Sequence, residues 1–265
     1  MNYLRPLTLL FIILGFAACK QADDPTILIN IENEFRVSME ESLEPGDNQL
    51  LLKVYTVEEL ECLNYEIFYS HSVSEGTVVA SIDELVEPEN CDVGMAHASA
   101  YINLGQLDVG TYALQLNLNN NSIVNNGLLV VNEHKYSVVL DTEHGLDIKP
   151  KELNKIPDGY FWGQINTASD LSSSINDDFL IELIQFSQNS NLSDGNYAYF
   201  EIDDKVIEFE EDIPVSFTNP HTSSFLFKMD SDGDSDAIKD LIETYRDNYM
   251  DKIDITATTS EGELL

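Results

Sequence analysis

Short apolar or alternating runs, separated by turn-forming residues, dominate the sequence from residue 27 to residue 148. Successive side chains of a β-strand point to opposite faces of a sheet, so such runs predict strands with one buried face. The segments EPGDN, SEG, PEN, NNNS and EHG between them have turn chemistry. The predicted strands are ILINIENEFRV, QLLLKVY, NYEIFYS, ASAYINL, TYALQLNL, GLLVV and YSVVL. Their number and spacing predict an all-β sandwich over residues 27–148.

The segment LDVGTY indicates the kind of sandwich. Leu107, Gly110 and Tyr112 have the spacing Leu-x-x-Gly-x-Tyr ahead of the alternating run ALQLNL. This spacing resembles the tyrosine corner of immunoglobulin-like domains, in which the phenol hydroxyl bonds back to the preceding backbone. The resemblance implies an immunoglobulin-like β-sandwich. Leu114 stands two residues after the tyrosine, where antibody domains have a cysteine, so any disulfide here is not the one typical of those domains.

The residues after 148 have a different character. Two prolines and several charges in DIKPKELNKIPDG indicate a linker at 149–158. Beyond it, YFWGQI, SSFLFKM and KIDITAT read as strands, YAYFEIDDKVIEFE as a hairpin and SINDDFLIELIQFS as a helix. A second helix is predicted at 236–250, because apolar side chains recur there at helical spacing. Residues 159–265 are therefore predicted to form an α+β domain.

Residues 1–18 have the layout of a secretory signal, with one arginine, an apolar run and the small residues Ala17 and Ala18. Cys19 follows directly. This arrangement resembles the lipobox of bacterial lipoproteins, whose signal peptide is cut before a cysteine that receives acyl chains such as palmitate; Phe16 stands where leucine is usual. The alternative is an ordinary secretory signal followed by a chance cysteine. The resemblance implies lipidation at Cys19.

The residues behind Cys19 predict a location. Segment 19–26 would be an acylated acidic tether, and its QADD resembles the acidic tags that route Bacteroidota lipoproteins to the cell surface. Two or three acyl chains anchor a protein stably, whereas one chain alone is marginal. We therefore expect a lipid-anchored protein of the outer membrane, displayed at the cell surface. The alternative is a solvated spacer on a protein that faces the periplasm.

The charge of the chain restricts its partners. The sequence has 48 Asp and Glu residues against 13 Lys and Arg residues, for a net charge of −35. Such a field repels nucleic acid and anionic lipid surfaces, so nucleic acid is not expected as a partner. It suits a soluble exterior, cationic partners or divalent ions. The hydrophobic content of 43% favours a folded chain over a disordered one.

With Cys19 assigned to lipid, two cysteines remain. Exported proteins fold in an oxidising compartment, so we predict a disulfide between Cys62 and Cys91. The chain contains no Cys-x-x-Cys segment. The bond is therefore expected to be structural rather than catalytic.

The segment DSDGDSD is the one candidate metal site. Its aspartates are Asp230, Asp232, Asp234 and Asp236. Alternating carboxylates can converge on one hard cation, as calcium loops require. Counted from Asp232, the segment resembles an EF-hand loop with Glu243 at position twelve, although Ala237 replaces the turn glycine. The alternative is an acidic start to the following helix, where carboxylates favour the helix dipole. No cofactor is expected to be required, and calcium is the candidate.

Aromatic residues in GYFWG give the candidate ligand site. Alternation along a strand places Tyr160 and Trp162 on one face and Phe161 on the other. If exposed, the first two could stack against a carbohydrate or anchor a protein partner. Packing in the core is the more common alternative, and it applies equally to the tyrosines of NYAYF.

Catalytic motifs are absent from the sequence. It contains no His-Glu-x-x-His, no Gly-x-Ser-x-Gly and no phosphate-binding glycine loop, and its five histidines are scattered. We therefore expect a non-catalytic binding or interaction module, with an extracellular glycan or protein as its ligand. The alternatives are a periplasm-facing accessory in envelope assembly and, further, a hydrolase. A binding module should show an exposed aromatic or apolar patch, and an accessory an extended edge strand.

Overall fold

The computed structural model describes residues 34–43, 48–209, 217–230 and 234–265. These residues belong to one packing unit, Ile31–Leu265. The predicted signal segment 1–18, the lipidation site Cys19 and the tether 19–26 lie outside the described residues. Those assignments stay predictions.

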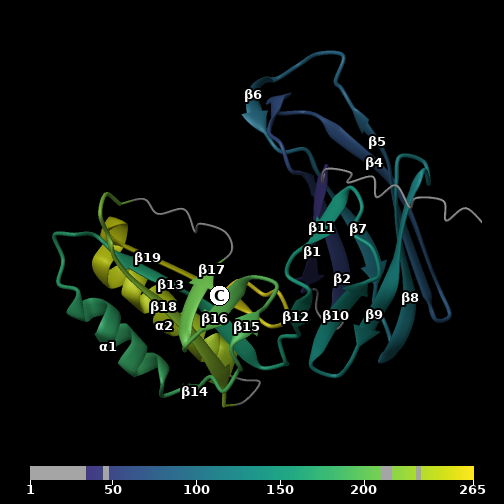
Figure 1. The fold of residues 1–265 in the computed structure, drawn as a ribbon. Coiled ribbons are helices and arrows are strands. Elements are labelled where there is room, and N and C mark those ends of the chain that lie inside the picture. The colour runs from purple at the N-terminus through teal and green to yellow at the C-terminus, as the bar shows by residue number, and fades with distance from the viewer. Residues whose placement is uncertain (1–33, 44–47, 210–216, 231–233) are drawn as a thin grey trace, which may run out of the picture. The chain divides into compact units, whose positions relative to one another are not determined.

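Two sheets pack face to face in the first half of the chain (Figure 1). The first has four strands, in the order β11 (Leu146–Ile148), β1 (Phe35–Ser42), β2 (Gln49–Thr56) and β7 (Ser99–Gly105). The second has six, in the order β12 (Glu152–Asn154), β10 (Lys135–Leu140), β9 (Ile123–Val131), β8 (Gly110–Leu118), β5 (Thr77–Val86) and β4 (Glu66–Ser74). One mainly aliphatic cluster fills the space between them, so this half is an all-β sandwich.

Among the described residues the sandwich is mainly antiparallel, with two exceptions. Strand β1 pairs in parallel with β11, and β5 pairs in parallel with β8. The predicted linker 149–158 contains strand β12, which pairs with β10 and buries Leu153 completely in the sandwich core. The chain therefore remains part of the sandwich until residue 154.

The tyrosine singled out in LDVGTY makes the hydrogen bond expected of it. The Tyr112 hydroxyl donates to the backbone carbonyl of Asp108, four residues upstream, at 3.0 Å. Tyr112 also packs against the edge of the sandwich cluster. The bond fastens the start of β8 to the loop that precedes it.

A two-stranded ribbon extends from the sandwich. It pairs β3 (Leu60–Cys62) with β6 (Val93–Ala96). The predicted disulfide is confirmed: Cys62 in β3 is bonded to Cys91, two residues before β6, with their Cα atoms 5.2 Å apart. The bond joins the two sides of the ribbon, and the β4–β5 hairpin lies between them in the sequence.

The second half is built on a four-stranded antiparallel sheet (Figure 1). Its order is β14 (Ser187–Asn189), β18 (His221–Met229), β13 (Tyr160–Thr167) and β19 (Ile253–Thr259). Helices α1 (Ser174–Leu183) and α2 (Asp234–Tyr249) cover one face, and a 3₁₀ turn at Met250–Lys252 leads into β19. The predicted apolar face of α2 is confirmed, since Ile238, Leu241, Ile242 and Tyr245 are buried and Tyr249 packs beside them.

The opposite face of this sheet is covered by a small meander. Its strands are β15 (Gly195–Asn196), β16 (Phe200–Asp203) and β17 (Val206–Phe209). The β16–β17 turn uses Asp204 and Lys205, both at positive φ, as tight hairpin turns require. The hairpin predicted over YAYFEIDDKVIEFE is therefore present as β16 and β17. Central strand β13 is thus buried on both faces.

Among the described residues, neither helix combines the length and hydropathy needed to cross a bilayer.

Candidate functional site

The two aromatic residues predicted to share a strand face do so. Tyr160 and Trp162 both pack into the cluster between the four-stranded sheet and the meander. Their exposed fractions are 3% and 4%, so neither is a free stacking platform. The Tyr160 hydroxyl donates to the side-chain oxygen of Asn191. Trp162, in contrast, borders an open cavity, so β13 brings one of the two candidates to a site and assigns the other to the core.

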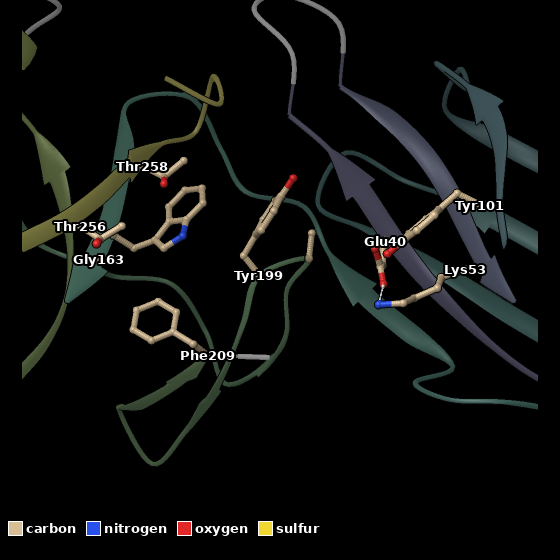
Figure 2. Close-up of a pocket in the computed structure, with 10 residues that line it drawn as sticks. Glu40, Lys53, Tyr101, Gly163, Tyr199, Phe209, Thr256 and Thr258 are labelled. Atoms are coloured by element: carbon tan, nitrogen blue, oxygen red, sulfur yellow. Dashed lines mark ion pairs between the residues drawn. The ribbon is translucent and has the colours of Figure 1, made fainter. Parts of the chain in front are cut away.

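The cavity, which we name the aromatic cavity, has a volume of about 330 Å³ (Figure 2). This is within the usual range of small-ligand sites, about 300–1,000 Å³. Its lining comes from the second-half sheet, the meander and the outer face of the four-stranded sandwich sheet. The residues are Glu40, Lys53, Tyr101, Trp162, Gly163, Ala198, Tyr199, Phe209, Thr256 and Thr258.

One wall of the aromatic cavity is built from rings. The ring centroids of Trp162 and Tyr199 are 5.8 Å apart and tilted by 31°, and Phe200 supports the indole at 5.3 Å. Tyr199 is 39% exposed, so much of its surface remains available to a ligand. Phe209, at the end of β17, points toward the same space (Figure 2). The wall is therefore apolar, and Phe200 and the cluster beneath it hold the indole in place.

The facing wall is charged. Lys53 in β2 lies 3.2 Å from the Glu40 carboxylate in β1, and its ammonium is 5.5 Å from the centre of the Tyr101 ring. Burial by itself lowers the pKa of Lys53, but the hydrogen bond to Tyr101 and the charge of Glu40 together raise it above its usual value. Lys53 is therefore charged across the physiological range, and it supplies fixed donors beside the carboxylate oxygens of Glu40.

Two threonines complete the cavity. The β13–β19 register pairs Trp162 with Thr258 and Gln164 with Thr256, so both hydroxyl side chains lie on the face of the sheet that carries the indole. Figure 2 shows Thr256 and Thr258 beside the aromatic wall. The site thus combines aromatic faces, hydroxyls and one ion pair. It can stack a flat or weakly polar ring and hydrogen-bond its edge.

A buried carboxyl lies next to this site but on the inner side of β1. Glu41 is 2% exposed; the Tyr136 hydroxyl donates to it at 3.1 Å and the Ile156 backbone N–H at 3.5 Å. Burial raises the pKa of Glu41, and these two bonds and the charge of Lys155 oppose that rise. The signal was present in the sequence, because Glu41 occupies the inward register of Phe35, Val37 and Met39. Through the bond from Ile156, the Glu41 carboxylate connects β1 of the sandwich to the segment that leads into the second half.

The calcium candidate is only partly within the described residues. Asp232 lies outside them. The Asp230 carboxylate accepts a hydrogen bond from the Gln188 side chain at 2.6 Å, and α2 begins at Asp234. In the described part of the chain, no group of three or more His, Cys, Asp or Glu side chains is placed to hold a metal. Calcium binding at Asp230, Asp232, Asp234 and Asp236 stays a prediction.

Sequence patterns did not identify most of the aromatic cavity. Glu40, Lys53 and Tyr101 lie at outward positions of alternating strands, a pattern they share with many solvated residues. Thr256 and Thr258 likewise alternate along β19. Tyr199 belongs to the segment NYAYF, whose pattern does not indicate that its ring lies beside Trp162. Only the pairing of distant strands brings these side chains together.

Comparison with known proteins finds no match for this chain among protein families, curated proteins or solved structures.

Proposed function

We propose that this protein is a lipid-anchored outer-membrane lipoprotein, displayed at the cell surface, that binds a neutral glycan without catalysis. The aromatic cavity is the observation that carries the proposal. Tyr199 offers an exposed ring face to the C–H groups of a sugar ring and Trp162 borders the cavity beside it, while Thr256 and Thr258 offer hydroxyls to the edge of the sugar. The lipobox-like segment and the QADD tag support the location.

The charged wall favours a neutral ligand. Glu40 and Lys53 pair with each other, so together they present both signs of charge at one place. A sugar hydroxyl can donate to the carboxylate and accept from the ammonium at once. A strongly charged ligand would gain from one partner and be repelled by the other. The pair therefore suits a polyol better than an anion or a cation.

The same wall favours binding over hydrolysis. Glycosidases commonly use two carboxyl groups that flank the scissile bond. Of the described side chains that line the aromatic cavity, Glu40 is the one carboxylate, and Lys53 neutralises it. We therefore propose a binding module rather than a hydrolase.

We also propose that the sandwich is an immunoglobulin-like domain and the second half an α+β domain. The Tyr112 bond to Asp108 and the two packed sheets support the first. The four-stranded sheet with both helices on one face supports the second. In this arrangement the sandwich sheet supplies the charged wall of the site and the α+β domain supplies the aromatic wall.

The single tryptophan makes the binding proposal directly testable. Trp162 is the only tryptophan of the chain and borders the cavity, so its fluorescence reports on occupancy. The full chain in mild detergent would be titrated with neutral cello-, manno- and xylo-oligosaccharides, with calorimetry in parallel. We expect at least one series to change the Trp162 emission and release heat. No response from any series would contradict the proposal.

A matched pair of variants locates the site. Tyr199 and Tyr69 are both 39% exposed, but Tyr69 in β4 does not line the cavity. Removing an aromatic stacking partner costs about 0.5–1.5 kcal/mol, so Tyr199→Ala should weaken sugar binding about two- to tenfold. Tyr69→Ala should leave it unchanged. Equal losses in both variants would show that the sugar binds elsewhere.

Surface display needs its own experiment. Intact cells would be treated with an external protease while the full-length protein is followed, with lysed cells and a Cys19→Ala variant as controls. We expect digestion on intact cells and loss of membrane attachment in the variant. Protection until lysis would show that the protein faces the periplasm.

A second candidate, the accessory in envelope assembly, is favoured by one observation. Strand β4 is an edge of the six-stranded sheet within the described residues, and it exposes Phe68, Tyr69 and Val73. An exposed edge strand can add a strand from another chain. If protease protection places the protein inside, β4 is the first surface to test for a partner.

A further inference from the structure

A second cavity lies within the sandwich and is independent of the glycan proposal. Its volume is about 580 Å³, and its floor is apolar, formed by Phe35, Leu60, Ile82 and Leu85. Phe35 and Ile82 are each 5% exposed, so the floor belongs to the packed core. We name it the acid-rimmed cavity, because Glu34, Glu58 and Glu84 stand around it.

The three carboxylates have no basic partner among the described residues. Residues 54–134 contain no lysine or arginine at all. The two nearest basic residues on the N-terminal side, Arg36 and Lys53, form ion pairs with other carboxylates. Arg36 lies 3.8 Å from Asp147, and Lys53 pairs with Glu40. The rim therefore holds negative charge that this part of the chain does not neutralise, beside the half-buried side chains of Leu60 and Leu85.

One wall of the cavity is fixed covalently. Leu60 lies in β3, which pairs with β6, and the Cys62–Cys91 disulfide closes that ribbon. Val57 and Glu58 lead directly into β3, so the ribbon also limits their positions. A cavity that is formed in advance costs a ligand little ordering entropy.

We propose that the acid-rimmed cavity binds a small organic cation with an apolar body, an alkyl- or arylammonium ion. The ammonium group would lie among Glu34, Glu58 and Glu84, and the hydrocarbon part would cover Leu60, Ile82 and Leu85. Carboxylates attract the cation, and burial of the hydrocarbon part adds a hydrophobic contribution. A bare metal ion would leave the apolar floor uncovered, and an anion would be repelled by the rim.

Phenethylammonium is a suitable probe, with 2-phenylethanol and phenylacetate as neutral and anionic analogues of similar size. Binding to the full chain in mild detergent would be measured by calorimetry, and the methyl signals of Ile82 and Leu85 would locate it. We expect the cation to bind and shift these signals, with both analogues much weaker. Equal binding of the neutral alcohol, or no shift at Ile82, would overturn the proposal.

Variants test the rim separately from the floor. The double variant Glu58→Gln and Glu84→Gln should weaken phenethylammonium binding about fivefold, because each exposed ion pair contributes only modestly to affinity. Glu75→Gln removes an exposed carboxylate of the β4–β5 turn that does not line the cavity, and it should have no effect. Tyr199→Ala should also have no effect, which distinguishes this cavity from the aromatic one. Loss of binding in Glu75→Gln or Tyr199→Ala would overturn the assignment.

Discussion

The two halves of the molecule use their sheets differently. In the sandwich, β1 alternates between buried and partly exposed residues, because one face meets the core and the other does not. In the second half, seven of the eight residues of β13 are buried, because helices cover one face and the meander covers the other. The outer face of the four-stranded sandwich sheet is therefore accessible to a ligand. The short meander leaves part of the second-half sheet uncovered as well. The aromatic cavity forms where both conditions occur.

The cores differ in chemistry as well. The sandwich cluster is mainly aliphatic, whereas the helix-covered cluster is rich in rings, with Phe161 packed against Phe225 and Phe227 at centroid distances of 6.2 and 6.0 Å. Large rings concentrate burial in few residues. Single core substitutions should therefore lower the free energy of unfolding most in the second half.

The largest expected effect is for Phe161→Ala. Phe161 is fully buried, and removing such a ring typically costs about 3–5 kcal/mol of unfolding free energy. Because Leu43 of the sandwich packs in the cluster with Tyr160 and Trp162, we expect one transition in which Trp162 fluorescence and the β-sheet circular dichroism are lost together. Two separate transitions in urea would show instead that the halves unfold independently.

Removal of the disulfide should be next in size. The double variant Cys62→Ser and Cys91→Ser releases a crosslink across 29 residues of sequence separation, which contributes about 3 kcal/mol in the chain-entropy description. Urea unfolding of the variant would be compared with that of the oxidised protein. Reduction of the parent protein should reproduce the loss, and a stability unchanged by both treatments would contradict the prediction.

Two glycines, one in each half, compare a crowded strand position with an open one. A Cβ at Gly163 in β13 would lie 1.9 Å from the carbonyl oxygen of Thr256, whereas one at Gly110 in β8 would meet nothing closer than 3.8 Å. Overpacking of this kind costs about 1–3 kcal/mol, so Gly163→Ala should destabilise by that amount. Gly110→Ala should change the unfolding free energy by less than about 0.5 kcal/mol. Similar losses of unfolding free energy in both variants would contradict this prediction.

The smallest expected effect is the pH dependence due to Glu41. Burial raises the folded-state pKa of Glu41 above its unfolded value, so the protonated form is favoured by folding. Its stabilising contribution is complete below the unfolded pKa and is lost as the pH rises through the folded pKa. Relative to Glu41→Gln, the parent protein should therefore lose stability as the pH rises from the unfolded-state pKa of a glutamate through the raised folded-state pKa of Glu41. Glu133→Gln, an exposed carboxyl, is the control; a parallel slope in parent and Glu41→Gln would refute the assignment.

Local patterns in the sequence predicted most of the long strands, because an alternating or apolar run with a flanking turn marks each of them; of β1 they marked only residues 35–37. They did not predict β3, β6, β11 or β12, which are too short to show a period. The parallel pairing of β5 with β8 joins distant segments and leaves no local pattern. The β5 run itself was not among the predicted strands, since several consecutive residues in it are buried.

The candidate site was predictable to a similar degree. Alternation correctly placed Tyr160 and Trp162 on one face of β13. It does not predict how much of that face the meander covers, and the extent of the meander determines that Trp162 and not Tyr160 borders the cavity. Lys53 and Tyr101 belong to the site because another sheet lies opposite. This packing is a property of the tertiary structure and leaves no local pattern in the sequence. The disulfide was predictable because few cysteines leave few pairings.

The disulfide between Cys62 and Cys91 determines when the acid-rimmed cavity can reach its final form. The cytoplasm keeps thiols reduced, so on the proposed export route this bond forms only after translocation. Until then Leu60 has no crosslinked ribbon to hold it, and the acid-rimmed cavity lacks a fixed wall. If the proposed cation binding and export are correct, a newly made chain would bind organic cations more weakly before the disulfide forms than after it.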